Sequence, residues 1–432
     1  MCSELFRIPL TWGNVPIFGA GVLLLVWAVF SVLGLKSTAR AVGWSTALKA
    51  HLPTIVIVAA AITFFVPKYF PDGVPIRGYG MMVLLGSIAG IWLSIRRAQQ
   101  AGLPGEEIMG LAVWMFIAGV AGARIFYVVE YWDDRIRQAD WLSTLKAALS
   151  FTEGGLVVYG AFIGAMIGFT LYMRRRGLPA LAVCDMISAG MLVGLAFGRI
   201  GCLMNGCCYG GESDAPWAIT FPRESGPEMV SPPYGEQASS GAFYGFHLKS
   251  SNDDAAPAII DRVTSGSIAV TAGLKAGDQI TKIDGNTLIG VAGAETLVYQ
   301  AFAQGKPLAI VTSDNSTHEL PAIEPPPRSR PVHPAQIYST ITAALLAWVL
   351  WSFYPFRRRD GEVTALMITL YPIARFFEES IRVDESPVFG TGLSISQNVS
   401  ILLLLAAVAM WVWLLRKPAG NLAFPQTAVA SR

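Results

Sequence analysis

Long apolar runs alternate with short polar loops along most of the chain. About 20 apolar residues cross the hydrocarbon core of a bilayer, so runs of this length predict membrane-spanning helices. The pattern predicts nine of them, at 17–35, 54–70, 79–95, 108–129, 155–173, 180–204, 335–354, 363–381 and 393–415. We therefore expect an all-α polytopic membrane protein, with one long interruption between the sixth and seventh spans.

Basic residues gather after every odd-numbered span and so predict the orientation. They are Lys36, Arg40 and Lys49, Arg96 and Arg97, Arg174 to Arg176, Arg357 to Arg359, and Arg416 with Lys417. Loops rich in Lys and Arg stay on the cytoplasmic side. This places the amino terminus and 205–332 outside, and the tail 417–432 in the cytoplasm.

The pattern changes from helical to strand-like within the exterior segment. Residues 207–240 are rich in Gly, Ser and Pro and are expected to form a linker. Beyond it, the chain predicts an alternating strand and a hairpin turn at Asp284-Gly. The domain resemblance described next implies further strands at 259–263 and 307–312 and a helix at 294–303.

Residues 272–286 join a short helix, a Gly-Asp turn, a strand and that hairpin turn, and so resemble part of a PDZ domain. The resemblance implies a domain at 241–322 and a peptide groove, because such domains add an extended peptide as a further strand. The loop at Phe243–Phe246 is similar to the one that receives a peptide's carboxylate, which makes Tyr244, Gly245 and Phe246 candidate peptide-binding residues. A domain that only shields the mouth of the membrane core is the alternative.

Composition supports a membrane protein, since charged residues make up 14% of the chain and apolar ones 53%. The net charge of +2 gives no indication of nucleic-acid binding. No metal or other cofactor is predicted: Cys202, Cys207 and Cys208 lack an evident fourth ligand, and apolar packing or a disulfide is the expected state. The first span is too long for a cleavable signal peptide.

Arg199 lies inside the sixth predicted span, in a segment with glycines on both sides. An arginine within a membrane helix costs about 2.5–3.5 kcal/mol, so it usually has a specific role. Beside exposed backbone N–H groups, its guanidinium suits a lipid phosphate. The alternative is a structural arginine paired with a buried acid.

Five motifs, in the same order, resemble those of the prolipoprotein diacylglyceryl transferases over about 75–416, apart from the insert. They are Gly198-Arg199-x-Gly201 with Asn205-Gly206, Gly122-Ala-Arg124 with Tyr127, Glu153-Gly-Gly with Tyr159 and Gly164, His333-Pro-Ala-Gln336-Ile-Tyr338, and Tyr371 with Arg375 and Arg382. The chain departs from the family at Tyr159, where a histidine is usual, and at Cys202 and Cys207, where Asn and Glu are usual.

The resemblance implies a seven-helix membrane core, formed by 76–206 and 323–416, with 1–75 added as a two-helix extension. It also implies a transferase of the bacterial inner membrane. Such an enzyme moves a diacylglyceryl group from phosphatidylglycerol to the cysteine thiol of a prolipoprotein signal peptide. The expected partners are thus the phospholipid, the prolipoprotein and the membrane, with a possible extended peptide at the PDZ-like groove.

The motifs carry the candidate site residues. Arg199 and Arg375 are expected to hold the departing phosphate, with Arg124 second. Other substrate-binding candidates are Tyr79, Asn205, Gly210, Gln336 and Tyr371. A carboxylate partner for Arg199 is sought among Glu153, Glu378 and Glu379.

Two residues are candidates for the general base. His333 accepts a proton near neutral pH, whereas Tyr159 titrates near pH 10 unless a cation lowers its pKa. His333 is favoured, with a role limited to orienting its loop as the alternative.

Other functions fit less well. The four histidines form no His-Glu-x-x-His, Gly-x-Ser-x-Gly is missing, and no repeat indicates a transporter. A catalytically altered relative that binds phospholipid or lipoprotein without transfer remains the alternative, because of Tyr159, Cys202 and Cys207.

Overall fold

The computed structural model describes residues 4–8, 19–70, 73–138, 140–150, 157–226, 229–249, 253, 255–382 and 391–420. Long helices dominate this part of the chain. Those of 18 residues or more are α1 (Gly19–Val42), α2 (Trp44–Tyr69), α3 (Gly78–Gln100), α4 (Gly105–Glu130), α6 (Val158–Arg176), α7 (Ala180–Asn205), α11 (Ala335–Phe353), α12 (Glu362–Glu379) and α13 (Ile395–Leu415).

Seven of these helices are long and apolar enough to cross a membrane, namely α1, α2, α3, α4, α7, α11 and α13. Helix α6 ends in three arginines, and α12 contains Glu362, Arg375, Glu378 and Glu379. The polytopic membrane architecture is therefore supported, while the count of nine spans stays a prediction. Helix α2 begins at Trp44 rather than 54 and contains Pro53, because hydropathy marks the apolar part of a helix and not its ends.

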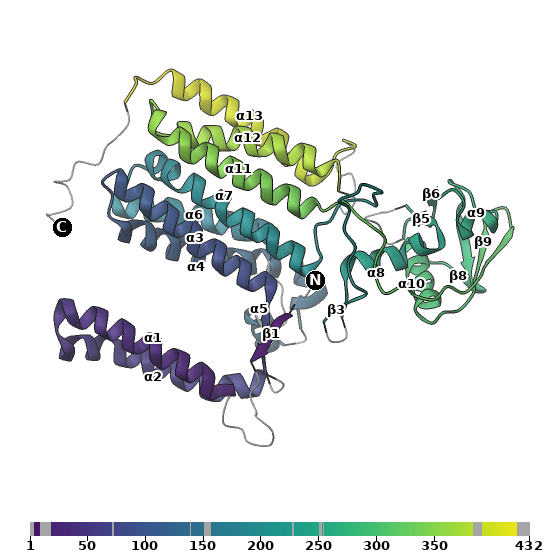
Figure 1. The fold of residues 1–432 in the computed structure, drawn as a ribbon, viewed down its shortest axis with the longest axis horizontal. Coiled ribbons are helices and arrows are strands. Elements are labelled where there is room, and N and C mark those ends of the chain that lie inside the picture. Colours follow the sequence, from purple (N-terminus) through teal and green to yellow (C-terminus); the bar gives the residue numbers. More distant parts are fainter. Residues whose placement is uncertain are drawn as a thin grey trace.

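The helices of the predicted core lie side by side in one bundle, and the α1–α2 hairpin lies beside it (Figure 1). Strand β1 (Glu4–Ile8) pairs antiparallel with β2 (Val74–Arg77), which leads directly into α3. This pairing crosses the boundary predicted at 75 and ties the extension to the core. A π-helical turn, η1 (Trp132–Ile136), and α5 (Trp141–Leu149) follow α4.

Glycines set the spacing between the helices of the bundle. A Cβ on Gly90 of α3 would lie 2.5 Å from the carbonyl oxygen of Gly190 on α7. Gly122 of α4 faces Gly160 and Gly164 of α6 in the same way. In a bilayer, where apolar side chains gain nothing from leaving lipid, such close backbone approach is the main source of helix association.

A buried carboxylate joins α7 to α12. Asp185, in the second turn of α7, accepts hydrogen bonds from the backbone N–H of Gly361 at 2.7 Å and of Thr364 at 2.8 Å. These groups belong to the amino terminus of α12, where helix N–H groups lack intrahelical partners and favour negative charge. The contact fixes the position of α12, and hence of its Arg375, relative to α7.

The insert between α7 and α11 contains short strands and helices. Its elements are β3 (Glu224–Gly226), β4 (Met229–Val230), α8 (Pro232–Ser239), η2 (Ala242–Tyr244), β5 (Phe246–Leu248), β6 (Ile260–Val263), α9 (Ile268–Thr271), β7 (Ile280–Ile283), β8 (Asn286–Thr287), α10 (Gly290–Ala303), β9 (Leu308–Thr312) and β10 (Thr317–Leu320). The largest sheet has the order β10-β9-β7-β8, and β5 pairs with β6.

The strands predicted at 259–263 and 307–312 are confirmed, and the predicted helix begins four residues earlier, at Gly290. The hairpin turn is also confirmed, since Asp284 and Gly285 both have positive φ, 49° and 79°. The identification of this domain as PDZ-like stays a prediction.

The expectation that 207–240 is only a linker is wrong, because α8 lies within it. Pro232 and Pro233 occupy the first turn of this helix, where a missing N–H costs nothing. Tyr234 and Ala238, one turn apart, are buried in the same apolar core as α10 and the sheet. The apolar core of the insert therefore includes α8.

Two antiparallel segments connect the insert to the bundle. Ile219 pairs with Val332, and Pro222 pairs with Arg328. Arg330 then donates from its side chain to the carbonyl of Ala242 at 2.6 Å, and its N–H donates to Gln237 Oε1 at 2.7 Å. The exit segment thus holds both α8 and η2.

The glycine contact predicts that Gly90→Ala lowers the free energy of unfolding by about 1–3 kcal/mol, the usual cost of overpacking. Gly80→Ala on the same helix is the matched control, since no atom lies within 4 Å of its new Cβ. Unfolding in mixed detergent, followed by tryptophan fluorescence, measures both. Equal stability of the two variants would contradict the packing argument.

The position of α8 predicts that the fragment 230–330 unfolds cooperatively in isolation and is more stable than the fragment 241–322. Tyr234 is 2% exposed, and loss of a buried aromatic side chain costs about 3–5 kcal/mol. Thermal denaturation followed by circular dichroism compares the two fragments. A fragment 241–322 as stable as the longer one would place α8 outside the core.

Candidate active site where helix α7 meets the insert

Arg199 and Arg375 line the same small cavity. Its walls come from α7, α11 and α12, and its lining includes Leu195, Arg199, Ser339, Tyr371, Arg375 and Glu378. Arg199 is half-buried and forms no hydrogen bond or ion pair within the described part of the chain. The structure thus brings together Arg199 from one sequence motif with Tyr371 and Arg375 from another.

Arg375 is buried and only partly neutralised. Its guanidinium lies 2.6 Å from Glu379 and donates to the hydroxyl of Ser396 at 3.0 Å. Its Nη1 is buried without a hydrogen-bond partner, and so is Oε1 of Glu378, whose other oxygen accepts from Ser339 at 2.6 Å. Buried polar atoms in native proteins almost always have partners, so these atoms mark a place for a polar ligand or water.

The end of α7 folds back on itself at Gly206. This glycine has φ +75°, and the N–H of Cys207 returns to the carbonyl of Cys202 at 3.1 Å. The turn is a common way to end a helix, and it satisfies carbonyls of the last turn. It brings the sulfur atoms of Cys202, Cys207 and Cys208 within 4.8 Å of one another.

The three cysteines are free thiols, as is Cys184. Among the cysteines that the structure describes there is therefore no disulfide, which was one of the two expected states of these three residues. Outside the helix, hydrogen bonds from the Cys202 and Cys207 thiols hold the pKa of Cys208 below its ordinary value, and the charges of Arg382 and Arg199 act in the same direction.

The loop after α7 packs against the start of α11. Gln336 donates to the carbonyl of Cys207 at 2.7 Å, and Gly210 and His333 are joined by a bond from the Gly210 N–H to the His333 carbonyl at 2.9 Å. A Cβ on Gly210 would lie 2.7 Å from that of His333, so the approach needs glycine. The structure therefore brings the loop at Cys207 and Gly210 against His333 and the first turn of α11.

His333 is half-buried, and its ring is oriented by an aromatic neighbour. Nδ1 lies 3.2 Å from the hydroxyl of Tyr338, which in turn accepts from the indole N–H of Trp217 at 2.7 Å. Within the described residues, no hydrogen bond involves Nε2 of His333. That nitrogen is therefore available to a substrate.

Tyr79 and Asn205 lie at the same end of the bundle. The ring of Tyr79, in the first turn of α3, packs on Gly201 of α7, where a new Cβ would lie 3.1 Å from it. Tyr79 interacts electrostatically with the three cysteines and with Arg199. Asn205 is the last residue of α7.

Tyr159 and Arg124 do not line this cavity. Tyr159 lies in the first turn of α6, which packs on α4, and is 53% exposed. Arg124 donates to the carbonyls of Ala147 and Ala148, at the end of α5, at 2.6 and 2.8 Å. Among the interactions of the described residues, none joins either side chain to Arg199.

Sequence reasoning missed Ser339, Ser396 and the carboxylate network around Arg375. No motif marks the two serines, because their role depends on which helix lies opposite. Of the three carboxylates considered for Arg199, Glu379 pairs with Arg375 instead and Glu378 lines the shared cavity. Glu153 lies outside the described residues.

In the loop expected to bind a peptide carboxylate, the backbone N–H groups already donate hydrogen bonds within the loop. The N–H groups of Tyr244, Gly245 and Phe246 all point to the carbonyl of Gly241, at 2.9, 3.2 and 3.3 Å. The side chains of Tyr244 and Phe246 are buried in the insert's core. Peptide binding here stays a prediction, and it requires this loop to rearrange.

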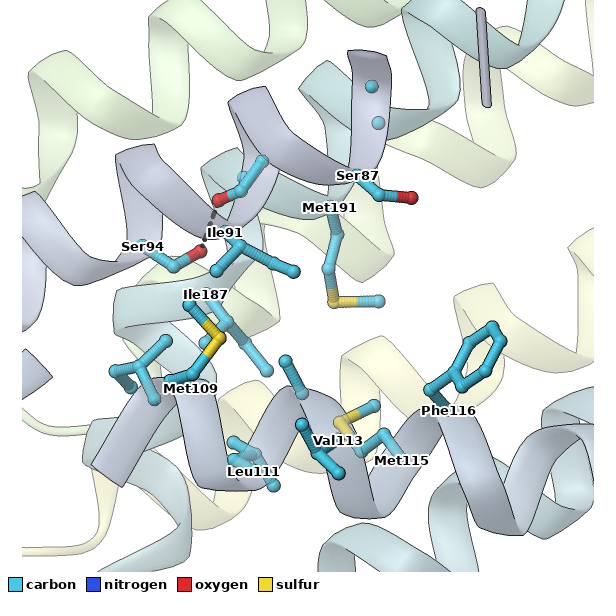
Figure 2. Close-up of a pocket in the computed structure, with 16 residues that line it drawn as sticks. Ser87, Ile91, Ser94, Met109, Leu111, Val113, Met115, Phe116, Ile187 and Met191 are labelled. Atoms are coloured by element: carbon cyan, nitrogen blue, oxygen red, sulfur yellow. Dashed lines mark hydrogen bonds between the residues drawn. The ribbon is translucent and has the colours of Figure 1, made fainter. Parts of the chain in front are cut away.

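A larger cavity of about 460 Å³ lies on the other side of α7, between α3, α4 and α7 (Figure 2). Its lining is almost entirely apolar and includes Ile91, Met109, Phe116, Ile187 and Met191. Gly86, Gly90, Gly190 and Gly194 also line it, where α3 and α7 pack closely.

Comparison with known proteins supports the motif assignments. The family model described as prolipoprotein diacylglyceryl transferase matches residues 67–413. A phosphatidylglycerol–prolipoprotein diacylglyceryl transferase of Rhodopirellula baltica is 35% identical over 94% of this chain and 88% of its own length. Relatives with that name from Clostridium perfringens (31% identical, 40% of this chain and 64% of theirs) and Thermosynechococcus vestitus (27%, 37% and 58%) match shorter parts.

Proposed function

We propose, from the premise that this chain belongs to the prolipoprotein diacylglyceryl transferase family, that it transfers the diacylglyceryl group of phosphatidylglycerol to the cysteine thiol of a prolipoprotein. The protein is thus a membrane transferase. The observation that carries the proposal is the pairing of Arg199 and Arg375 around one cavity, since each arginine comes from a different family motif.

The reaction forms one carbon–sulfur bond and breaks one carbon–oxygen bond. The thiol loses its proton and its sulfur attacks the lipid carbon that carries the phosphate ester, because the thiolate is the nucleophilic form. The electron pair of the broken bond leaves on the phosphate oxygen. The products are a thioether, glycerol phosphate and a proton.

Arg199 and Arg375 are suited to stabilise the departing phosphate. Arg199 is free of partners in the described chain, and Nη1 of Arg375 has none. Fixed cations in a water-poor site stabilise charge that develops in the transition state far better than they do in water. The cavity as it stands has room for only about one water molecule, so a phosphate enters when the surrounding side chains move apart.

The apolar cavity between α3, α4 and α7 is suited to an acyl chain of the phospholipid. Its walls offer hydrocarbon and almost no hydrogen-bonding groups. The chain's remaining partner, the prolipoprotein, is expected to approach from the end of the bundle that carries the insert.

The proposed location is the bacterial inner membrane, with the insert outside and the tail 417–432 in the cytoplasm. The ends of α3 and α6 that carry arginines, and the end of α11 that leads to Arg357–Arg359, lie at the end of the bundle opposite the insert (Figure 1). This distribution supports the orientation inferred from the loops, and with it the nine spans.

The alternative of a family member that binds lipid without transfer is not favoured. The Rhodopirellula baltica relative, which matches nearly the whole chain, is named as a transferase. Peptide binding by the insert also gains no support, because the N–H groups it needs are already bonded.

The arginine pair predicts that Arg199→Ala and Arg375→Ala each reduce turnover by about 10²–10³-fold, the usual cost of removing a group that stabilises transition-state charge. Lysine at either position restores less than full activity, because it keeps the charge but loses the two-pronged geometry. Transfer from phosphatidylglycerol to a lipobox peptide is the measurement. Arg137→Ala, at an exposed ion pair, is the control. Full activity of both lysine variants would refute a geometric role.

The position of His333 predicts that it, and not Tyr159, accepts the thiol proton. His333→Ala is expected to lower kcat/KM by about 10²–10⁴-fold, as for loss of a general base. Tyr159→Phe is expected to stay within a few-fold, since Tyr159 is exposed on α6. Tyr338→Phe, which removes only the orienting hydroxyl, separates orientation from proton transfer. An inactive Tyr159→Phe beside an active His333→Ala would reverse the assignment.

A further inference from the structure

The cluster of Cys202, Cys207 and Cys208 at the end of α7 has no role in the function described so far. Its sulfur atoms come within 4.8 Å of one another. Arg199 precedes Cys202 by three residues on the same helix, and residues at that spacing share one face. Thiol chemistry and phosphate chemistry are therefore placed within one helical turn.

The cluster has the donor set of a soft metal ion. Thiolates select zinc and similar ions, and a zinc–sulfur bond of 2.3 Å in tetrahedral geometry separates two ligand sulfurs by about 3.8 Å. The three sulfurs need to contract by no more than about 1 Å to reach that geometry. The three cysteines are only partly buried.

The cluster is also built from a rigid turn. Gly206 in the left-handed region and the bond from the Cys207 N–H to the Cys202 carbonyl hold the first two sulfurs. Gln336 of α11 binds the carbonyl of Cys207, and Cys208 has φ 59°, which is uncommon for a residue with a side chain. Ligands held this way lose little entropy when an ion binds.

No fourth His, Cys, Asp or Glu joins the group within the described residues. Catalytic zinc sites typically have three protein ligands and leave the fourth position to water or substrate, whereas structural sites use four. A closed structural site is therefore not what these residues form.

We propose that Cys202, Cys207 and Cys208 bind one zinc ion whose open position takes the thiol of the prolipoprotein cysteine. The proposal rests on the proposed transferase function. A thiol that coordinates zinc loses its proton, so the ion supplies the thiolate in a chain that has Tyr159 where the family has histidine.

The step balances with the transferase reaction. The substrate thiol displaces water from zinc, and its proton passes to His333. The bound sulfur then uses one electron pair to form the bond to the lipid carbon, and the carbon–oxygen pair leaves with the phosphate toward Arg199 and Arg375. The neutral thioether is a weak ligand, and water replaces it.

Three thiolates and one zinc ion carry a net charge of −1. Arg199 and Arg382 both contribute favourable charge at Cys208. A disulfide between two of the thiols, or a copper(I) ion held by all three in a plane, leaves no position for a substrate. These are the competing outcomes.

The test begins with metal content. Full-length protein purified in detergent without chelator is expected to contain about one zinc per chain by mass spectrometry. Cys202→Ser, Cys207→Ser and Cys208→Ser are expected to lose most of it, whereas Cys184→Ser, the matched control on α7, keeps it. The double variant Cys202→Asn with Cys207→Glu carries the residues that are usual in the family. It is expected to fold, so its loss of zinc cannot be attributed to misfolding. Wild-type protein without zinc that cannot be loaded with it, or with a disulfide within the cluster, overturns the proposal.

Cobalt(II) substitution then tests the open position without relying on activity. Its sulfur-to-cobalt absorption is expected to rise by about one third when a lipobox peptide adds a fourth thiolate to three. The same peptide with serine in place of cysteine is expected to produce no rise. An unchanged spectrum with the cysteine peptide overturns the proposal even if zinc is bound.

Activity separates the two hypotheses. Removal of zinc by a chelator is expected to lower transfer at least tenfold, and zinc but not magnesium restores it. Full activity of the metal-free enzyme overturns the zinc site and leaves the transferase function standing. A cobalt spectrum that responds to the peptide, in a protein that transfers nothing, supports the site and overturns the function.

Discussion

Close backbone contact between α7 and its neighbours is the constraint on which the rest of this structure depends. Gly90 and Gly190 allow α3 and α7 to approach until no Cβ fits between them. Because α7 carries Arg199 and Cys202 and leads directly into Cys207 and Cys208, its position decides where these candidate groups lie. In lipid, this contact has few substitutes, since larger apolar side chains would pack equally well against acyl chains.

Charge inside the bundle is tolerated because it is distributed over several helices. Asp185 of α7 binds the start of α12, and Arg375 of α12 meets Glu379 and the hydroxyl of Ser396. The incomplete pairing of Arg375, with one nitrogen left over, is costly for stability alone. A site that must bind phosphate and release it gives a physical reason for retaining that cost.

The insert is joined to the end of the bundle that carries the candidate site more closely than a tethered domain would be. Tyr209, just after the cysteines, bonds to Glu236 of α8, and Arg330, shortly before His333, bonds to the loop at Ala242. Two short segments thus lead from the insert directly to the candidate site. The insert is therefore in a position to influence the loop that holds Gly210 and His333.

The sequence alone determined the elements that depend on local pattern. Apolar length predicts the long helices, alternation and the Asp284-Gly turn predict the strands of the insert, and motif spacing identifies the arginines.

Only the tertiary structure decided which of these residues meet. Arg199 and Arg375 are 176 residues apart in the chain, and α8 is a helix because the insert's core receives Tyr234, in a segment whose composition indicates a loop. The three sulfurs converge because Gly206 reverses the chain. Whether these cysteines pack as thiols, form a disulfide or bind a metal could not be predicted from their spacing, which matches no metal-binding signature. Local pattern specifies how a segment folds, whereas contacts between distant segments depend on packing that no single segment encodes.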